Sequence, residues 1–262
     1  GLDTSLLQDL VDKAKQDGVT VRAMAVINPG NPTGQCLSKA NQADIINFCM
    51  KNNLLLVADE VYQSNVYVDD KQFHSFKKVR CELGADELQL ASLHSISKGF
   101  LGECGRRGGY VEIVGLPEDV MGEMYKLASV NLCPNLSGQI SMANQMNPPK
   151  PDEPSYALYS AERGAILDSL KARAKIVSNA LNELEGVSCQ PAEGAMYCFP
   201  SITLPNAAIE EALGKGQAPD FMYCMQCLEA TGLVTVPGSG FKQVDGTWHF
   251  RTTFLPTEDD LK

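Results

Sequence analysis

The sequence predicts an α/β fold, with a large domain built on a mostly parallel sheet and a smaller α+β domain after it. In the first half of the chain, short apolar runs rich in β-formers alternate with stretches of helical periodicity, which is typical of parallel strands joined by helices. A proline-rich connector interrupts this pattern at 147 to 154, and a long helical stretch follows it. The chain therefore divides into residues 1 to 150 and 151 to 262.

The composition excludes several classes of protein. Of the 262 residues 44% are hydrophobic and 21% charged, which suits a globular core. The formal net charge is −10 and no basic run exceeds two residues, so we expect no nucleic-acid partner, since that would need clustered Lys and Arg. The longest aliphatic stretch is about five residues, against roughly 20 for a membrane span, so we expect no membrane segment.

In the large domain an amphipathic helix comes first. Strands are predicted at 21 to 27, 54 to 58, 88 to 94 and 109 to 114. Ser38 is expected to cap the helix between the first two strands. Polar residues cluster where these strands end, and ligands of open α/β sheets bind at the carboxyl ends of the strands.

In residues 151 to 262 a long helix at 156 to 184 links the large domain to the small one. Short strands are predicted at 195 to 199, 233 to 236 and 248 to 254, with a helix at about 220 to 230. The only tryptophan, Trp248, is expected in the core of this small domain.

Nine cysteines, an odd number scattered along the chain, favour free thiols over a disulfide framework. This favours an intracellular location, in the cytoplasm or the mitochondrion. Cys224 and Cys227 have C-x-x-C spacing but no second Cys or His pair nearby, so we interpret them as helical residues, one of them in the core. For His74 and His94 we find no partners at metal spacing either, and we expect packed histidines and no metal site.

Four polar clusters carry the functional signal. They are NPGNPTG at 28 to 34, Asp59 with Tyr62, SISK at 95 to 98, and GECGRRGG at 102 to 109. Alone, each has an ordinary explanation: a helix cap, a solvated lysine or a simple turn. In this order they resemble the large domain of the fold type I aminotransferases, which use pyridoxal 5′-phosphate.

Longer strings resemble the alanine aminotransferases of that family in particular. These strings are FHSFKKV at 73 to 79, GECG at 102 to 105, EGAMY at 193 to 197 and VPGSGF at 236 to 241. The resemblance covers essentially the whole chain. It implies a homodimer, and it implies that an amino-terminal part and a carboxy-terminal helix of the family lie outside these residues.

The resemblance gives catalytic roles to Lys98, Asp59 and Tyr62. Lys98 would form a Schiff base with the cofactor aldehyde and then move a proton from the substrate Cα. Asp59 would keep the pyridine nitrogen protonated. Tyr62 would donate to the cofactor 3′-oxygen, and Asn31 would bond to the same oxygen from the opposite side.

Phosphate and carboxylate groups need cationic and hydroxyl donors. For the cofactor phosphate we expect Ser95 and Arg107, with Ser97 as a second hydroxyl. Arg106 is the alternative, because many relatives place the phosphate arginine eight residues after the lysine. For the substrate, the resemblance implies Arg251 as the carboxylate clamp, with Asn31 and Gly194 lining the same site.

The function implied is transfer of the amino group of L-alanine to 2-oxoglutarate, giving pyruvate and L-glutamate by a ping-pong route. A relative that uses glyoxylate as acceptor would share these motifs, and a cofactor-dependent lyase would share Lys98, Asp59 and Arg251. The alternative from another class is a non-catalytic interaction module on the same fold.

Overall fold

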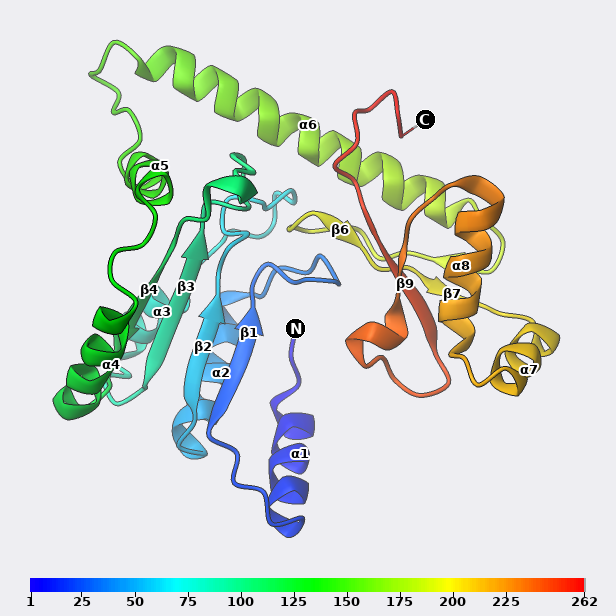
Figure 1. Cartoon of the computed structure of the whole chain (residues 1–262), viewed down its shortest axis with the longest axis horizontal. Helices are drawn as coiled ribbons and strands as arrows, with labels where there is room; N and C mark the ends of the chain where they lie inside the picture. Colours follow the sequence, from blue (N-terminus) through cyan, green and yellow to red (C-terminus); the bar gives the residue numbers. More distant parts are fainter. Residues whose placement is uncertain (262) are drawn as a thin grey trace. The chain divides into compact units, whose positions relative to one another are not determined.

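The computed structural model describes residues 1–261, which divide into two compact units (Figure 1). The first unit contains Gly1–Pro29 and Cys36–Ala161. The second contains Gly30–Gln35 and the chain from Glu162 onward. A short turn near the amino terminus thus belongs to the unit that is formed mainly by the C-terminal part of the sequence.

The first unit is built on a four-stranded sheet in the order β1-β2-β3-β4. The strands are β1 (Ala23–Ile27), β2 (Leu55–Asp59), β3 (Leu90–Ser95) and β4 (Gly109–Val114). β1, β2 and β3 are parallel, and β4 runs antiparallel to β3. The predicted α/β class with a mostly parallel sheet is confirmed.

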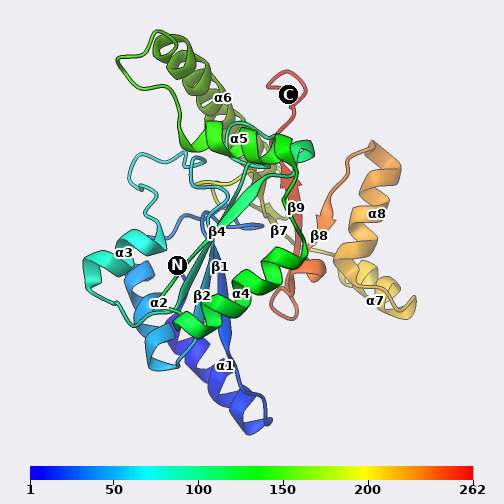
Figure 2. The same ribbon diagram turned by 60° about the vertical axis from the view of Figure 1, so that its left-hand side comes forward.

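Three helices form the main core with one face of this sheet. They are α1 (Thr4–Gln16), α2 (Lys39–Lys51) and α3 (Phe76–Leu83). Figure 2 shows α2 and α3 together on the same side of the strands. Ser38 caps α2 as predicted, because its hydroxyl accepts the Asn41 N–H at 3.1 Å.

The alternation of side chains along the strands separates a buried face from a more open one. Leu56, Ala58 and Leu90 are fully buried in the core under α2 and α3. Asp59 and Ser95 follow the opposite parity, so they lie on the other face, and both are half-buried. The sheet thus presents its two polar strand ends on the face that the three helices leave uncovered.

Two helices that the sequence did not predict, α4 (Glu118–Val130) and α5 (Leu136–Met146), follow β4. No residue of α4 is buried, and Tyr125 and Leu127 are each 71% exposed. Asn135 caps α5 through the Gly138 N–H at 2.8 Å. Its amide also donates to the Arg107 carbonyl at 3.0 Å, which ties α5 to the glycine-rich loop.

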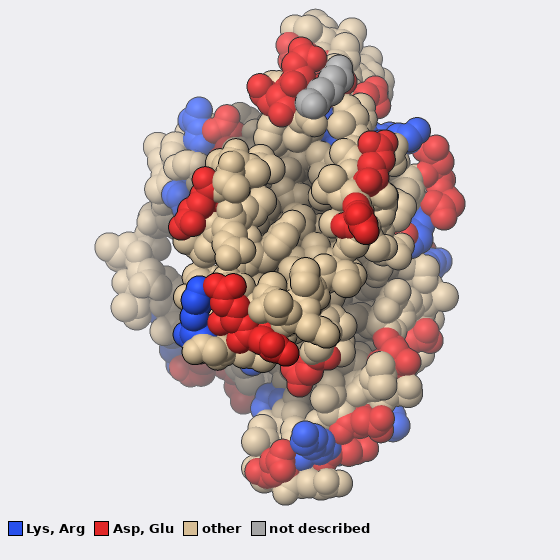
Figure 3. Space-filling view, turned by 90° about the vertical axis from the view of Figure 1, so that its right-hand side faces the viewer, with Lys and Arg blue, Asp and Glu red and all other residues tan. Residues whose placement is uncertain are grey.

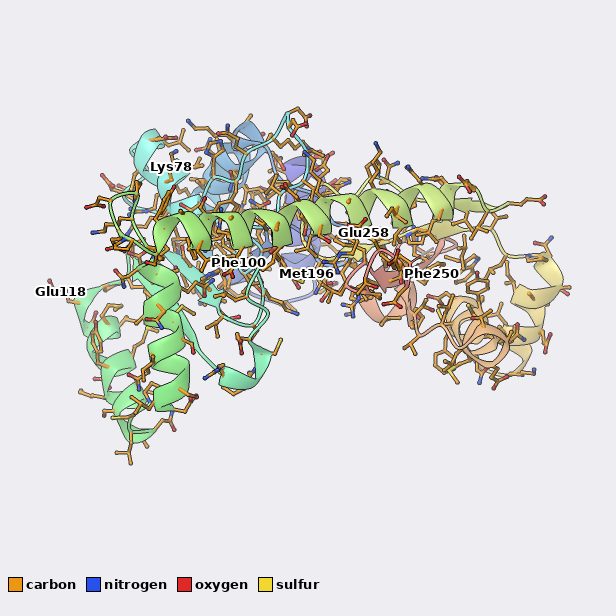
Figure 4. All side chains as sticks on the ribbon, turned by 90° about the horizontal axis from the view of Figure 1, so that it is seen from above. Lys78, Phe100, Glu118, Met196, Phe250 and Glu258 are labelled. Atoms are coloured by element: carbon orange, nitrogen blue, oxygen red, sulfur yellow. The ribbon has the colours of Figure 1, made fainter. Side chains whose placement is uncertain are left out.

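The long helix α6 (Tyr156–Asn182) begins in the first unit and continues in the second (Figure 4). Within the second unit, its Ser169 hydroxyl donates to Glu258 at 3.3 Å, and Arg173 donates to the carbonyls of Leu255 and Pro256. These contacts hold the C-terminal segment against α6. The helix predicted at 156 to 184 matches these bounds closely.

The second unit contains a five-stranded antiparallel sheet in which β9 is the central strand. The order is β5-β7-β9-β6, with β8 also paired to β9. Its strands are β5 (Val187–Ser188), β6 (Tyr197–Cys198), β7 (Ser201–Ile202), β8 (Val236–Pro237) and β9 (Trp248–Thr253). The helices α7 (Asn206–Gly214) and α8 (Pro219–Thr231) complete it.

The strand predicted at 195 to 199 is shorter in the structure. It breaks at Phe199 and Pro200, because proline has no N–H for a sheet ladder, and β7 resumes the pairing with β9. Trp248 packs partly buried against the cluster of Ile202, Cys224 and Phe250, as predicted. Cys224 is buried in α8 and Cys227 is half-buried, also as expected.

Neither a basic patch on the face drawn in Figure 3 nor a metal-binding group within residues 1–261 stands out. On the face drawn in Figure 3, basic side chains form no continuous patch. Within residues 1–261, the acidic, His and Cys side chains form no group of three or more that could hold a metal ion. Over the same residues, none of the helices has both the length and the apolar character that crossing a bilayer requires.

The turn at residues 30 to 35 is held inside the second unit by main-chain contacts. Gly34 accepts the Gly194 N–H at 2.8 Å and has a left-handed backbone with φ +68°. A Cβ on Gly34 would lie 2.8 Å from the Tyr197 carbonyl oxygen, closer than real Cβ contacts. Glycine is therefore required here both by conformation and by space.

We predict that Gly34→Ala lowers the free energy of unfolding by clearly more than Gly18→Ala does. Gly18 also has positive φ, +75°, but open space around it, so alanine there should cost only the conformational strain of about 1 kcal/mol. The difference between the two variants, measured by chemical denaturation, reports the clash with the Tyr197 carbonyl. Equal losses would show that the turn moves aside freely.

Candidate functional site

In the first unit, the predicted cofactor residues share one edge of the sheet. β2 ends at Asp59 and β3 ends at Ser95. β4 is antiparallel and begins at Gly109, opposite Ser95, so the glycine-rich loop returns to the same edge. The topology thus places the segment from 95 to 109 beside the end of β2, as expected for a ligand site in an open α/β sheet.

Tyr62 and Lys98 lie close together at this edge. Tyr62 is 2% exposed in the turn after β2, and the Lys98 amine lies 5.8 Å from the centroid of its ring. Asp59 accepts the Val61 N–H at 3.3 Å, which orients the carboxylate at the start of the same turn. A carboxylate, a phenol and an amine therefore come from two neighbouring strand ends.

The turn that carries Ser95, Ser97 and Lys98 is fixed by the glycine-rich loop. The Ser97 N–H donates to the Ser95 hydroxyl at 3.2 Å, which leaves the Ser95 O–H able to donate to a ligand. Cys104 donates its thiol to the Ser97 carbonyl at 3.1 Å. The Glu103 N–H donates to the Ile96 carbonyl at 3.1 Å, so the two segments form one local structure.

The two arginines of the loop differ in their contacts. Arg106 pairs with Glu103 at 3.4 Å, so its charge is already partly balanced. Arg107 has a left-handed backbone with φ 54°, and its guanidinium donates to the Cys104 carbonyl at 2.8 Å. Arg107 is exposed and keeps further donors for an anion, which favours it over Arg106 for the phosphate; the assignment remains a prediction.

A cavity of about 420 Å³ lies beside this loop but is not the predicted cofactor site. It is lined mainly by apolar and amide side chains from the segment at 96 to 106, from α5 and from the start of α6, and its lining includes the charged side chains of Glu103 and Arg106. None of the six first-unit residues proposed for the cofactor is among its lining residues.

His94 is a packed histidine behind the site, as predicted. It is 5% exposed, and its two ring nitrogens lie 3.1 Å and 3.2 Å from the side-chain amides of Gln63 and Gln145. Burial lowers the pKa of His94, so the ring is neutral at physiological pH. A neutral ring accepts at one nitrogen and donates at the other, and the buried Gln145 Oε1, which has no hydrogen-bond partner, is the natural acceptor if that amide is turned.

Glu60 is a buried acid that the sequence analysis did not single out. Its carboxylate accepts the Phe76 N–H at 2.7 Å, which links the end of β2 to the first turn of α3. Burial raises the pKa of Glu60 to about 7; the Phe76 hydrogen bond opposes this, and Asp59 and Glu112 add to it. The sequence could have indicated that Glu60 is buried. Successive side chains of a strand point to opposite faces, so if Asp59 faces the ligand, Glu60 faces the core.

In the second unit, Arg251 and Asn31 form a second polar group. Arg251 donates to the Asn31 side-chain oxygen at 3.0 Å, although 220 residues separate them in sequence. Its guanidinium lies 4.4 Å from the Tyr197 ring centroid and 5.1 Å from that of Phe241, within cation–π range. The roles of Tyr197 and Phe241 were not predicted, although both lie in strings that carried the resemblance.

Gly194 lies next to this group. It is buried, and its N–H donates to Gly34. Ala195 follows with φ 60° and is fully buried. Both positions hold small buried residues close in sequence to Tyr197. That this segment lines the substrate site remains a prediction.

A family model for the class I and II aminotransferases matches residues 1–262, and the chain belongs to this family. The Arabidopsis thaliana protein named alanine aminotransferase 2, mitochondrial is 57% identical over 100% of this chain and 49% of its own length. The probable mitochondrial alanine aminotransferase of Dictyostelium discoideum is 55% identical with the same coverage. The chain spans about half the length of these relatives.

Two further proteins are also similar to this chain. Glutamate–glyoxylate aminotransferase 1 of Arabidopsis thaliana is 51% identical over 100% of this chain and 55% of its own length. The solved alanine aminotransferase of Pyrococcus furiosus superposes with a TM-score of 0.74 at 26% identity, covering 96% of this chain and 57% of that one. The fold is that of the type I pyridoxal-phosphate enzymes, as predicted.

The cofactor implied by the family, pyridoxal 5′-phosphate, suits the side chains present. Its ring nitrogen, 3′-oxygen, aldehyde and phosphate call for a carboxylate, a phenol, an amine and cationic or hydroxyl donors. Asp59, Tyr62, Lys98 and Ser95 supply these groups from one edge of the sheet, with Arg107 in the adjoining loop. The close approach of Gly108 to the Gly138 carbonyl, where a Cβ would lie 2.5 Å away, keeps that loop against α5.

We predict that Glu60→Gln reduces the loss of stability between pH 4.5 and 7. The pKa of Glu60 in the folded protein is raised from its ordinary value of 4.5 to about 7, so within this window the folded protein holds a proton that the unfolded chain has released. The free energy of unfolding therefore falls as pH rises, by about 3 kcal/mol in total. Unfolding measured from pH 4 to 8 should show a flatter profile for the variant.

The matched control is Glu123→Gln, because the side chain of Glu123 is exposed on α4. It should leave the wild-type profile unchanged. His94 acts in the opposite direction, because its lowered pKa costs stability as pH falls below 6.5, so the difference between the wild-type and variant profiles isolates Glu60. Superimposable profiles for wild type and Glu60→Gln would refute the assignment of a protonated Glu60.

Proposed function

We propose that the protein carrying this chain transfers the amino group of L-alanine to 2-oxoglutarate, giving pyruvate and L-glutamate. The observation that carries the proposal is the identity of 57% over the whole chain with a protein named alanine aminotransferase. The described residues include the carboxylate, phenol, amine and guanidinium groups to which this proposal assigns roles. The amino-acid and 2-oxo-acid substrates are small anions, which suits arginine-based recognition.

The chemical work of this chain centres on Lys98 and Asp59. Pyridoxal 5′-phosphate, when bound, withdraws the electron pair left at the substrate Cα and carries the amino group from one substrate to the next. The Asp59 carboxylate holds a proton on the ring nitrogen, and Lys98 moves the proton at the substrate Cα. Tyr62 donates its O–H to the 3′-oxygen, while Ser95, Ser97 and Arg107 bind the phosphate.

Arg251 acts as the carboxylate clamp. Its planar guanidinium can bind a carboxylate with two parallel hydrogen bonds, and the rings of Tyr197 and Phe241 hold the group in place. Asn31, which accepts one of its N–H groups, restricts it further. L-Alanine and 2-oxoglutarate both carry an α-carboxylate, so one clamp serves both half-reactions; Gly194 lines the substrate beside it.

Glyoxylate as acceptor is the second candidate, supported by the 51% identity to a glutamate–glyoxylate aminotransferase. A lyase or a non-catalytic module has no comparable support, because the similar proteins of Arabidopsis thaliana and Dictyostelium discoideum are named as aminotransferases. Assay of the full-length protein with L-alanine and each 2-oxo acid separates the two. The proposal requires a kcat/KM for 2-oxoglutarate above that for glyoxylate, and the reverse order would favour the second candidate.

We also propose a homodimer in the mitochondrion or cytoplasm. The exposed apolar side chains of α4, including Tyr125, Leu127 and Val130, support an interface on that helix. Two relatives are named as mitochondrial, and nine free cysteines suit a reducing compartment. Sedimentation of the full-length protein and imaging of a tagged copy test the two points.

We predict that Lys98→Ala lowers the rate of amino transfer at least about a hundredfold, since proton transfer loses its base. Ser95 and Arg107 are unchanged, so the variant should still bind pyridoxal 5′-phosphate, measured by equilibrium dialysis. Lys78→Ala, at an exposed lysine of α3, is the control and should keep full activity. A Lys98→Ala protein with more than a few per cent of the wild-type rate would rule out this role.

We predict that Arg251→Lys raises KM about tenfold for both L-alanine and 2-oxoglutarate, because an ammonium cannot replace a bidentate hydrogen bond. Cofactor binding should be unaffected. Steady-state kinetics with each substrate varied in turn provide the measurement, and Arg22→Lys, at an exposed position, is the control. A change confined to one substrate would mean that Arg251 recognises its distal group.

A further inference from the structure

Asp220 is a fully buried carboxylate in the second unit that has no role in the chemistry described above. It lies in the first turn of α8. Acidic side chains are common in the first turn of a helix, where they interact with the free N–H groups of that helix, but they are rarely buried. Asp220 differs from this pattern, because both hydrogen-bond donors to its carboxylate come from outside α8.

The carboxylate holds the turn that follows β8. Its Oδ2 atom accepts the Ser239 N–H at 2.6 Å and the Gln243 side-chain N–H at 3.0 Å. Ser239 belongs to the 3₁₀ turn η2 (Gly238–Phe241), and Gln243 follows that turn closely. The two donors lie on either side of Phe241 in sequence, so one oxygen atom fixes the turn before and after that ring.

The second oxygen of Asp220, Oδ1, is buried and has no hydrogen-bond partner within residues 1–261. Over the same residues, Asp220 forms no ion pair with a lysine or an arginine. Moving a carboxylate out of water opposes folding unless hydrogen bonds or a cation compensate, so a carboxylate placed in this way is weak evidence for stability. The arrangement instead indicates that the position of the turn matters.

Gln243 extends the contact from Asp220 to β9. Because its amide N–H faces the carboxylate, its amide oxygen faces the His249 ring, whose Nδ1 lies 2.9 Å away and donates to it. The His249 ring stacks on Phe199, with the centroids 5.0 Å and the planes 5° apart. Phe199 in turn forms a T-shaped pair with Phe241 at 5.7 Å. The Phe241 ring is thus held through its own turn and through β9.

The turn also starts beside the arginine group. β8 pairs with β9 just before the turn and sets Val236 opposite Arg251. A Cβ on Gly238 would lie 2.9 Å from the His249 carbonyl oxygen, closer than real Cβ contacts, so the turn and β9 are in close contact. The Phe241 ring centroid lies 5.1 Å from the guanidinium. A displacement of the turn therefore changes the packing on Arg251.

We propose that Asp220 is a positioning residue for the arginine that binds the substrate carboxylate, and that it acts through the turn that carries Phe241. The inference rests on the proposed function, because it takes Arg251 as the carboxylate clamp. With the turn fixed, the Phe241 ring restricts the guanidinium before a substrate arrives. Restricting a binding group in advance lowers the entropy that binding must remove, and so favours binding.

Loss of the carboxylate should weaken substrate binding without slowing the chemistry of the bound substrate. Ser239 and Gln243 would lose their shared acceptor, and the turn between them could move away from the arginine. Lys98 and Asp59, to which the proposed function assigns proton transfer and ring protonation, are unchanged. A rise in KM with little change in kcat is the signature of lost binding that is common to the ground state and the transition state.

The test compares Asp220→Ala with Asp220→Asn in the full-length protein loaded with pyridoxal 5′-phosphate. For Asp220→Ala we expect KM to rise about fivefold for both L-alanine and 2-oxoglutarate, the order of one lost cation–π contact, with kcat nearly unchanged. Asparagine can place its amide oxygen at Oδ2 and its NH₂ group at Oδ1, so it should keep both KM values close to those of wild type. Val244→Ala, at an exposed side chain after the turn, is the control and should change neither constant.

Two further measurements separate positioning from a general loss of structure. If Asp220 acts through Phe241, then adding Asp220→Ala to Phe241→Leu should raise KM no further. Propionate, which has the carboxylate and methyl group of alanine but no amino group to transfer, should bind about fivefold more weakly to Asp220→Ala in calorimetry. If Asp220→Ala does not fold, Gln243→Leu takes its place; it removes the bonds to Asp220 and His249 and should also raise both KM values.

Unchanged KM values and propionate affinity in Asp220→Ala, or in Gln243→Leu where that variant replaces it, would overturn the proposal. An equal loss in Asp220→Asn would also overturn it, because the negative charge and not the two hydrogen bonds would then be required. Additive effects of Asp220→Ala and Phe241→Leu would show that Asp220 does not act through the ring. If the wild-type protein transfers no amino group from L-alanine to 2-oxoglutarate, the proposed function fails, whereas propionate binding still tests Asp220.

Discussion

Most of the first unit's chemistry depends on the pairing of β2 with β3. Parallel strands bring their carboxyl ends to one edge, and the register that aligns Asp59 with Leu93 sets Ser95 just beyond it. The antiparallel β4 then returns the glycine-rich loop to the same edge. Because side chains alternate, the same register directs Asp59 and Ser95 to one face and Glu60 and His94 to the other.

The apolar core face of the sheet therefore ends in two buried polar side chains, Glu60 and His94. Glu60 is joined to α3 through Phe76, and His94 lies between the amides of Gln63 and Gln145. Burial favours the neutral form of both Glu60 and His94. Below about pH 7 the two groups therefore add little charge beside Asp59, whereas above it Glu60 becomes a second carboxylate next to Asp59.

Sequence reasoning succeeded where a local pattern dictates the structure. Apolar runs predicted β2 and β3, Ser38 marked the start of α2, and the motif residues fell at strand ends. It missed α4, none of whose residues is buried. Sequence reasoning finds a helix most readily from an apolar stripe that packs on a core, and α4 has no such packing within the described residues. It also missed the packing of Tyr197 and Phe241 on Arg251, because three segments distant in sequence create that contact and no local signal records it.

The turn at residues 30 to 35 makes the chain pass between the two units three times, after Pro29, after Gln35 and after Ala161. Neither unit is thus a continuous piece of sequence. A gene split in the proline-rich connector would leave the C-terminal product without the Gly34 carbonyl that accepts from Gly194 and without the Asn31 oxygen that Arg251 uses. Any attempt to exchange this small unit between related enzymes must therefore transplant a short N-terminal peptide together with it.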